Sequence, residues 1–571
     1  MKYCLSVLCL AVCLAFALPL DASVEDSAEA RLDALIERYL DDYWQRHPDR
    51  ATRAGLSDWN DRLPDLRAEA LAAEAEALRV FLMELAGIDP ERLGSIDHRV
   101  DHDLMARHLR IRLAEIETLP RWRREPRLYL PFHAFNDLIL DEFAPLEQRI
   151  DWLQARLDQL PTLLQAGQAN LDRAPRRFVE DAIRSTESQL PFFRETVPAF
   201  AARVPERTES VQAAAAAAAD AVEDYLVFLR ADLLPRADGE VAVGREVYDF
   251  YLQVLHGLEL DADGLIELGQ RYYDEIEARL AAQAERIAPG RHWADVTEDI
   301  RDDHPTREDL LDAYCRDIQR SRAHVVERDL ATVPPNEEVR CIHSDPSQRA
   351  FSPFGTFRTP APFSESKIGY LILHPVPEGL SAEEETRRLR AHDFSWIEVI
   401  APHEAYPGHH LQAILAQENP RPLRRVYSTP VFTEGWGLYT EELMHETGFF
   451  RTPEETRLTQ LRLQLWRAAR VLLDARLHTG QISVEEARDF LAEHIRMEYG
   501  ATAGEVNIYV YRPSYAIGYV VGFYEMMALR EQARAARGED FELKAFHDEV
   551  LSLGSMPFPL VRELMALPPE P

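Results

Sequence analysis

Apolar residues recur at three- and four-residue intervals along most of this chain, and this spacing limits its fold more than any other feature. Between residues 27 and 45, for example, Leu32, Leu35 and Ile36 would share one face of a helix. The same spacing recurs in residues 61–86, 262–287, 307–330, 453–477 and 484–497. The sequence therefore predicts a mainly α protein.

Residues 333–380 interrupt the helical pattern, because they are rich in proline, glycine and β-forming residues. "GYLILH" is a strand candidate, and "FGTFRTPAPF" is a second strand or a loop. We expect a small β-sheet inserted here, directly before a cluster of histidines. The rest of the chain contains no repeat and no flexible linker, so residues 27–567 are expected to form one helical unit with two lobes.

The N-terminus has the pattern of a signal peptide. Lys2 precedes an apolar stretch at residues 4–18, and Ala15-Phe16-Ala17 fits a cleavage site for residues 1–17, with 1–22 as the longer option. The apolar stretch is short for a membrane span. We expect a periplasmic or secreted protein with no stable membrane association after cleavage. The less favoured alternatives are an anchor helix and a lipid anchor on Cys13, because Val12 is a poor residue before a lipidated cysteine.

The net charge of −34 excludes some partners. Phosphate groups would be repelled, so we expect neither nucleic acid nor an anionic membrane surface as a partner. The charge also has a simpler role in keeping the protein soluble. The sequence indicates no particular oligomeric state.

Only two cysteines, Cys315 and Cys341, follow the predicted signal peptide. In an oxidising compartment they could pair. Two buried free thiols are the alternative, and the sequence does not distinguish between them.

The segment "APHEAYPGHHLQ", residues 401–412, concentrates groups that bind metals. Zinc takes three or four nitrogen, oxygen or sulfur ligands. His409 and His410 follow His403 by six and seven residues, which in a regular helix means separations of about 9 and about 10.5 Å along the axis. One ion cannot bridge such distances. Pro407 and Gly408 predict a bulge or break that would bring His409 or His410 back beside His403.

A third ligand is available in "FTEGWGLYTEE", residues 432–442. A turn-rich connection at 418–430 would let a helix starting near residue 431 return antiparallel and present Glu434. Glu441, seven residues further along, lies on the same face and could hydrogen-bond a histidine ligand. His410 is either a group of this supporting kind or an alternative ligand. A solvated loop and a surface carboxylate would explain each motif alone, but not their combination.

Three segments carry a resemblance to a known family: "HEAYPGHHLQ", "FTEGWGLYTEEL" and "RPSYAIGYVVG". They resemble the bacterial family DUF885, which is similar in layout to the gluzincin metallopeptidases, including angiotensin-converting-enzyme-like and carboxypeptidase Taq-like enzymes. The resemblance covers roughly residues 30–565. It implies a metallopeptidase-like fold with the sheet beside a central cleft. The family pattern H-E-x-x-P-G-H selects His409, and implies a single zinc ion on His403, His409 and Glu434, with Glu404 as general base.

The third segment adds candidates for binding the substrate. In the gluzincin layout a tyrosine late in the chain stabilises the oxyanion, and the resemblance implies Tyr519 for this role. Tyr515 stands where the family pattern has glutamine; Tyr511, Tyr515 and Arg512 are alternatives. Arg512 could also bind a substrate carboxylate with two hydrogen bonds. Tyr370 lies on the strand expected at 367–373, which could pair with a peptide backbone. A plain aromatic packing helix is the competing interpretation of the segment.

These observations together predict an exported zinc-dependent hydrolase that cleaves short peptides, as an oligopeptidase or an exopeptidase. One alternative is a metal-dependent hydrolase of a non-peptide amide or ester, whose site would look the same. Another is a non-catalytic protein that binds zinc or peptides, although such a protein would not need Glu404. A purely structural helical scaffold is the least favoured.

Overall fold

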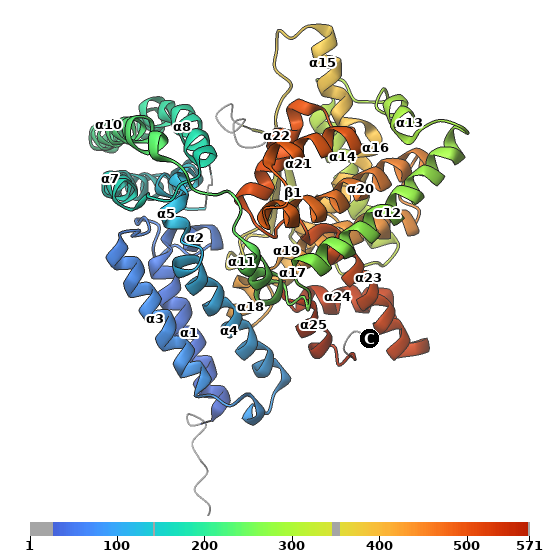
Figure 1. Ribbon diagram of the computed structural model, residues 1–571, viewed down its shortest axis with the longest axis horizontal. Helices are drawn as coiled ribbons and strands as arrows, with labels where there is room; N and C mark the ends of the chain where they lie inside the picture. The colour runs from blue at the N-terminus through green and yellow to red at the C-terminus, as the bar shows by residue number, and fades with distance from the viewer. Residues whose placement is uncertain (1–26, 141–142, 345–354, 569–571) are drawn as a thin grey trace, which may run out of the picture.

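The computed structural model describes residues 27–140, 143–344 and 355–568, so the predicted signal peptide lies outside the described residues. The fold is mainly α-helical with one small sheet, as predicted. Figure 1 shows the N-terminal helices on one side of the molecule and the C-terminal helices with the sheet on the other. Within the described residues, none of the helices is both long enough and apolar enough to cross a membrane.

The N-terminal lobe comprises the helices α1–α10. Their bounds are α1 (Ala28–Arg46), α2 (Pro48–Ala54), α3 (Ala68–Ala86), α4 (Ile96–Glu117), α5 (Arg121–Arg124), α6 (Phe132–Leu140), α7 (Leu146–Asn170), α8 (Arg176–Pro191), α9 (Val197–Ala201) and α10 (Pro205–Phe228). The expected helix at 27–45 is α1. It begins where the Ser27 hydroxyl accepts a hydrogen bond from the backbone N–H of Ala30 at 3.1 Å.

The C-terminal lobe comprises the sheet and the helices α11–α25. The helices are α11 (Arg245–Phe250), α12 (Ala262–Ile287), α13 (Trp293–Ile300), α14 (Leu310–Glu327), α15 (Ala382–Leu389), α16 (Phe394–Glu404), α17 (His409–Ala416), α18 (Pro422–Val426), α19 (Pro430–Glu446), α20 (Pro453–His478), α21 (Val484–His494), α22 (Tyr499–Tyr511), α23 (Gly518–Arg537), α24 (Leu543–Ser552) and α25 (Phe558–Leu564). Their two longest members, α12 and α20, pack along each other.

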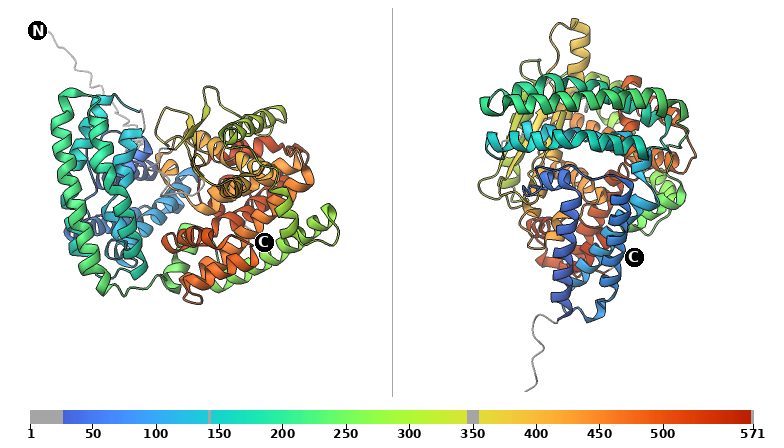
Figure 2. Two further views of the ribbon diagram at one scale, coloured as in Figure 1. Left: turned by 90° about the horizontal axis from the view of Figure 1, so that it is seen from above. Right: turned by 90° about the vertical axis from the view of Figure 1, so that its left-hand side faces the viewer.

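Apolar side chains form two separate cores. One core is built from residues between Leu63 and Leu233, mainly where α10 packs on α7 through its buried Ala214, Ala215, Ala218 and Ala219. The other core joins α1, α3 and α4 to the helices of the C-terminal lobe. The first helices of the chain are thus packed against the C-terminal lobe, whereas α6–α10 have a core of their own. Figure 2 shows α7 and α10 running together along one side of the molecule.

The sheet has three strands in the order β1-β3-β2: β1 (Glu338–His343), β2 (Gly355–Arg358) and β3 (Ile368–Leu373). β1 is parallel to β3, and β2 is antiparallel to it. β3 and β2 fall in the two segments expected to form strands, whereas β1 was not expected. Because β3 is the central strand, its hydrogen-bonding edges are occupied from Tyr370 to Leu373. The expectation that this strand pairs with substrate is therefore wrong. Among the described residues, β1 and β2 each leave one edge of the sheet unpaired.

Cys315 and Cys341 form a disulfide that links α14 to β1, which settles the choice left open by the sequence. Their Cα atoms lie 6.1 Å apart, within the usual range for a disulfide. The bridge fixes one end of the sheet to a helix of the C-terminal lobe.

Candidate metal centre

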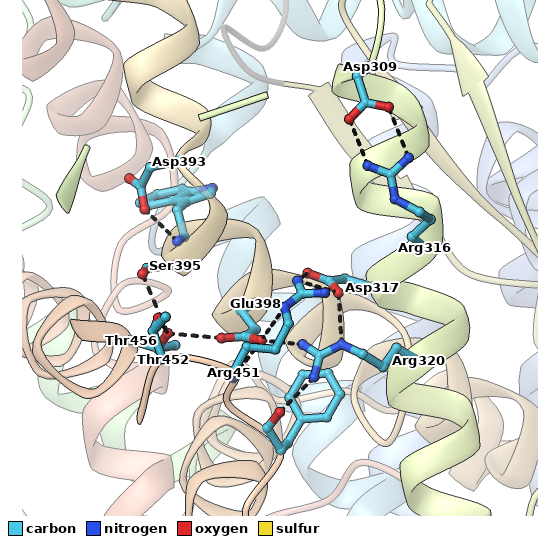
Figure 3. Close-up of polar contacts among 12 residues, drawn as sticks. Asp309, Arg316, Asp317, Arg320, Asp393, Ser395, Glu398, Arg451, Thr452 and Thr456 are labelled. Atoms are coloured by element: carbon cyan, nitrogen blue, oxygen red, sulfur yellow. Dashed lines mark hydrogen bonds and ion pairs between the residues drawn. The ribbon is translucent and has the colours of Figure 1, made fainter. Parts of the chain in front are cut away.

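α16 carries His403 and Glu404, and buried polar contacts fix it on its neighbours α14 and α20 (Figure 3). Asp393 caps the start of the helix by accepting a hydrogen bond from a backbone N–H of the first turn at 2.8 Å. Further along, the buried Glu398 carboxylate accepts hydrogen bonds of 2.9 Å from Thr456 Oγ1 and from the backbone N–H of Arg451. It also forms an ion pair with Arg320 of α14. These contacts hold α16 in place from its first turn onward.

The helix is interrupted at the position that Pro407 and Gly408 predict: α16 ends at Glu404, and α17 begins at His409. Only glycine fits at position 408, because an added Cβ would lie 1.8 Å from the backbone oxygen of His403. Across this break, backbone hydrogen bonds from Gly408 to Pro402 and from Leu411 to Ala405 connect the two helices. The rings of His403 and His409 lie with their centres 4.8 Å apart.

Glu434 on α19 completes a triad with these two histidines. Its Oε2 lies 3.7 Å from Nε2 of His403 and 3.4 Å from Nε2 of His409. The candidate ligand atoms of the three residues all lie within 4.8 Å of one another. A tetrahedral zinc ion, with ligands at about 2 Å, needs ligand atoms about 3.3 Å apart, so a small contraction would suffice. Elsewhere in the described part of the chain, no other three metal-binding side chains come together in this way.

Two carboxylates give His403 its orientation and its charge. Its Nδ1 is 2.8 Å from Oε1 of the fully buried Glu441, which leaves Nε2 directed toward Glu434. Burial opposes the protonated imidazole, but the contact with the Glu434 carboxylate and the hydrogen bond with Glu441 outweigh it and raise the pKa of His403 to about 10. Burial likewise opposes ionisation of Glu434, but its hydrogen bonds with the two histidines hold its pKa well below the usual value. The triad is thus built to hold a positive charge.

Gly437 on α19 makes room for the His403 ring, since an added Cβ would lie 2.5 Å from Cε1 of His403. We expect Gly437→Ala to lower the free energy of unfolding by about 1–3 kcal/mol through this clash, despite the better helix propensity of alanine. Gly504→Ala is the matched control, because Gly504 is also helical and has no atom near its missing Cβ. It should raise stability by up to about 1 kcal/mol. Urea denaturation measures both, and a stable Gly437→Ala protein would contradict the packing described.

His410 is placed away from the triad. It is completely buried, and its Nε2 lies 3.0 Å from Oε2 of Glu337, which also accepts a hydrogen bond from the Tyr406 hydroxyl. Arg322 forms an ion pair with the other oxygen of Glu337 at 2.7 Å. His410 therefore binds α17 to the segment before β1. Sequence reasoning missed Glu337, since a single glutamate in a proline-rich stretch carries no signal.

Three further side chains surround the triad. Glu404 is half-buried, and its carboxylate makes none of the hydrogen bonds or ion pairs found among the described residues. The Tyr515 hydroxyl donates a hydrogen bond of 2.5 Å to Oε1 of Glu434. The ring of Tyr519 is stacked with that of His403, with centres 6.4 Å apart. Burial is the main cause that raises the pKa of both tyrosines above its ordinary value, so both hydroxyls remain protonated donors at neutral pH.

Two arginines of α20, also missed from the sequence, flank Tyr519. The guanidinium carbon of Arg470 lies 4.5 Å from the centre of the Tyr519 ring, and Arg470 is bound by both oxygens of Glu505 at 2.7 and 3.0 Å. Arg467 lies 5.8 Å from the same ring and 3.8 Å from Glu441. The sequence indicates these two arginines only by placing them among the apolar residues of one helix face.

A large cleft of about 2780 Å³ separates the two lobes and leads to this site. Its lining comes from both lobes and includes Tyr515, Tyr519 and the exposed Arg512, whose guanidinium lies 5.0 Å from the Tyr515 ring. The triad itself lies behind the two tyrosines and does not line the cleft. Tyr370 does not line it either: the ring contacts Arg358 of β2 at 4.9 Å, and it is Arg358 that faces the cleft.

Residues 48–565 match the family model described as "Bacterial protein of unknown function (DUF885)". Two solved structures share the fold. A "putative lipoprotein of unknown function" from Shewanella oneidensis has a TM-score of 0.79 at 20% identity, over 95% of this chain and 100% of that chain. A "putative lipoprotein" from Colwellia psychrerythraea has a TM-score of 0.78 at 20% identity, over 95% of this chain and 99% of that chain. No curated protein matches the chain. Because the family model spans most of its length, the chain belongs to the DUF885 family of bacterial proteins.

Proposed function

We propose that this protein is an exported zinc-dependent hydrolase that cleaves short peptides in the periplasm or outside the cell. The observation that carries the proposal is the triad of His403, His409 and Glu434, whose ligand atoms lie within 4.8 Å of one another. An unengaged carboxylate, Glu404, directly follows the first histidine of the triad. The triad also lies behind two tyrosines at the inner end of a large cleft.

The residues present suit a single zinc ion. Two imidazole nitrogens and one carboxylate oxygen form a common donor set in catalytic zinc sites, and it leaves one position for water or substrate. The hydrogen bond from His403 to Glu441 is the kind of support that orients metal-binding histidines. The missing side chain at Gly437 leaves the space that the His403 ring needs.

When bound, zinc would supply a Lewis acid that polarises the scissile carbonyl and lowers the pKa of water. Glu404 would accept the proton of the attacking water and pass it to the leaving amine. The protonated hydroxyl of Tyr519 would donate a hydrogen bond to the developing oxyanion. Tyr515 would hold Glu434 in position through the hydrogen bond that it already makes.

The cleft favours extended peptides over folded proteins. The open edge of β2 faces it through Thr356 and Arg358, and a peptide backbone could pair there. Arg512 is exposed on the cleft wall beside Tyr515 and could bind a carboxylate of the substrate.

The activity is tested directly by adding unblocked peptides, N-acyl amino acids and esters to zinc-loaded protein and to protein stripped of metal. Mass spectrometry of the products identifies any bond that is cleaved. We expect cleavage of peptides by the zinc-loaded sample alone. Cleavage of esters or N-acyl amino acids without cleavage of peptides would make the protein a hydrolase of another class.

A variant beside the triad tests the role of Glu441. We expect Glu441→Gln to weaken zinc binding by about 10- to 100-fold, because the neutral amide orients His403 less firmly and removes a negative charge. Glu442→Gln is the matched control: Glu442 is also buried on α19, but it pairs with Arg457 at 2.7 Å and not with a histidine. Competition with a chelator measures both affinities. Equal losses in the two variants would show that Glu441 has no particular role at the site.

A further inference from the structure

The cleft carries a surplus of positive charge although the whole chain is strongly acidic. Fifteen arginines line it against ten aspartates and glutamates, whereas the chain has 64 lysines and arginines against 98 aspartates and glutamates. A cleft with a surplus of one charge sign favours ligands of the opposite sign. The substrate that enters this cleft is therefore expected to be anionic.

One face of α20 connects the site to the outer part of the cleft. Arg462, Trp466 and Arg470 follow one another at four-residue intervals, share this face and line the cleft. Arg470 is the inner member, in contact with Tyr519. The indole N–H of Trp466 is buried without a hydrogen-bond partner. Eight residues of helix place Arg462 about 12 Å from Arg470 along the axis.

Arg462 differs from Arg470 in having no ion-pair or hydrogen-bond partner among the described residues. Its Nε is buried without a hydrogen bond, and its guanidinium forms none of the ion pairs found in the described part of the chain. Burial lowers the pKa of Arg462 to about 10, because the attraction of Asp393 only partly offsets the loss of solvent. The group thus remains charged at neutral pH, and an anionic ligand would offset the cost of holding it there.

A side pocket of about 500 Å³ opens from the cleft at this point. The residues that line both the pocket and the cleft are Glu298, Arg301, Arg462, Ile495 and Arg496. Arg301 and Arg390 already neutralise Glu298, with contacts of 3.0 Å each. Arg496 is exposed and makes none of the ion pairs found among the described residues. It adopts a φ of 56°, which residues other than glycine rarely adopt. Two guanidinium groups, on Arg462 and Arg496, are therefore free to bind a ligand.

We infer that this side pocket is a subsite for a carboxylate of the substrate, bound by Arg462 and Arg496. Arg462 lies about 12 Å along α20 from Arg470, which contacts the oxyanion tyrosine. An extended peptide covers that distance in three to four residues, at about 3.3 Å per residue. The inference rests on the proposed function and specifies its substrate class: peptides with a negative charge three to four residues from the scissile bond. An aspartate or glutamate side chain and a free C-terminal carboxylate offer the same chemistry.

The test measures binding first, so that it does not depend on turnover. The peptides consist of alanine and glycine, are acetylated and amidated at their ends, and carry either one aspartate or one asparagine at the same position. They are titrated into zinc-loaded Glu404→Gln protein. For one position of the charged residue in the peptide, we expect the aspartate peptide to bind about tenfold or more tightly than the matched asparagine peptide. A third set without aspartate but with a free C-terminus distinguishes the two sources of the carboxylate. Product analysis with the unmodified protein locates the scissile bond relative to the charge.

Variants then assign the effect to the pocket. Arg462→Gln, and separately Arg496→Gln, should each remove most of the preference for aspartate and change binding of the asparagine peptide by less than about twofold. Arg184→Gln is the matched control, because Arg184 lines the cleft from the N-terminal lobe and already pairs with Asp181. It should leave the preference intact. Circular dichroism verifies that each variant is folded.

The outcomes separate the subsite from the proposed activity. Equal weakening of the aspartate and asparagine peptides in both pocket variants, or no preference for aspartate at any position, would overturn the subsite. A preference that depends on Arg462, without hydrolysis of any peptide by the unmodified protein, would support the subsite and refute the peptidase. Hydrolysis of peptides without a preference that depends on Arg462 would support the peptidase and refute the subsite.

Discussion

Glu404→Gln is expected to reduce peptide hydrolysis by about 10²- to 10⁴-fold while the protein keeps its zinc. The carboxylate makes none of the hydrogen bonds or ion pairs found among the described residues, so it is free to act on water. The amide has almost the same shape, but it cannot accept the proton of the attacking water. Steady-state kinetics on a peptide found to be cleaved, together with metal analysis of the same sample, measures both effects.

Glu418→Gln is a suitable control for this variant. It removes the same charge from an exposed residue shortly after α17, where Glu418 pairs with Lys367 and with no other described residue. Its activity should remain within about twofold of the unmodified protein, as is usual for an exposed pair. Activity of Glu404→Gln above a tenth of the original would remove Glu404 from the role of general base.

The second large effect concerns metal content. Purified protein should carry about one zinc ion per chain, the number held by one site with two histidines and a carboxylate. His403→Gln and His409→Gln should bring the content close to zero, because each removes a ligand. His410→Gln should retain the metal, because His410 contacts Glu337 and not the triad. Elemental analysis after dialysis against a weak chelator gives the three values.

His410→Gln serves here as the matched control, since it makes the same substitution one residue along the chain. Glutamine can still donate a hydrogen bond to Glu337, so the variant should fold. Loss of zinc in His410→Gln alone would move the site to the other histidine. A protein that takes up no zinc even when the metal is added would refute the metal centre and, with it, the peptidase.

The helical part of the fold could be predicted because its signals are local. The ranges expected for α1, α12 and α20 agree with the observed helices to within a residue or two, since apolar spacing and capping residues lie within each segment. β1 could not be predicted in the same way. Only Val339 of its six residues is buried, so the strand lacks the alternation that identifies others. It is defined by its pairing with β3, about thirty residues later in the chain.

In the candidate site, too, some features follow from the local sequence and others from contacts between distant segments. The spacing of His403, Glu404 and Glu434 suggested which residues could meet, because each lies on a helix whose direction the sequence indicates. The choice between His409 and His410 could not come from spacing, since both follow the same break. In the structure, the contact between His410 and Glu337 distinguishes the two histidines, and Glu337 lies in a distant segment of the chain. Arg462 and Arg496 could not be anticipated either. Their proposed role in binding a carboxylate depends on the absence of ion-pair partners among the described residues, which the sequence does not show.

The two separate cores have a consequence for how a substrate enters. Helices α6–α10 enclose their own core, and part of one cleft wall belongs to this unit. It meets α22 of the opposite lobe through polar and aromatic contacts: Arg177 binds Asn507 at 2.7 Å, and Tyr511 binds Asp181 at 2.6 Å. Contacts of this kind exchange readily with water, whereas a shared apolar core does not. Among the described residues of this unit, Phe178 alone belongs to the other core, where its ring stacks on that of Tyr511. We therefore expect the wall to move relative to α22 more readily than helices that share one core, which would let a long chain enter the cleft from the side.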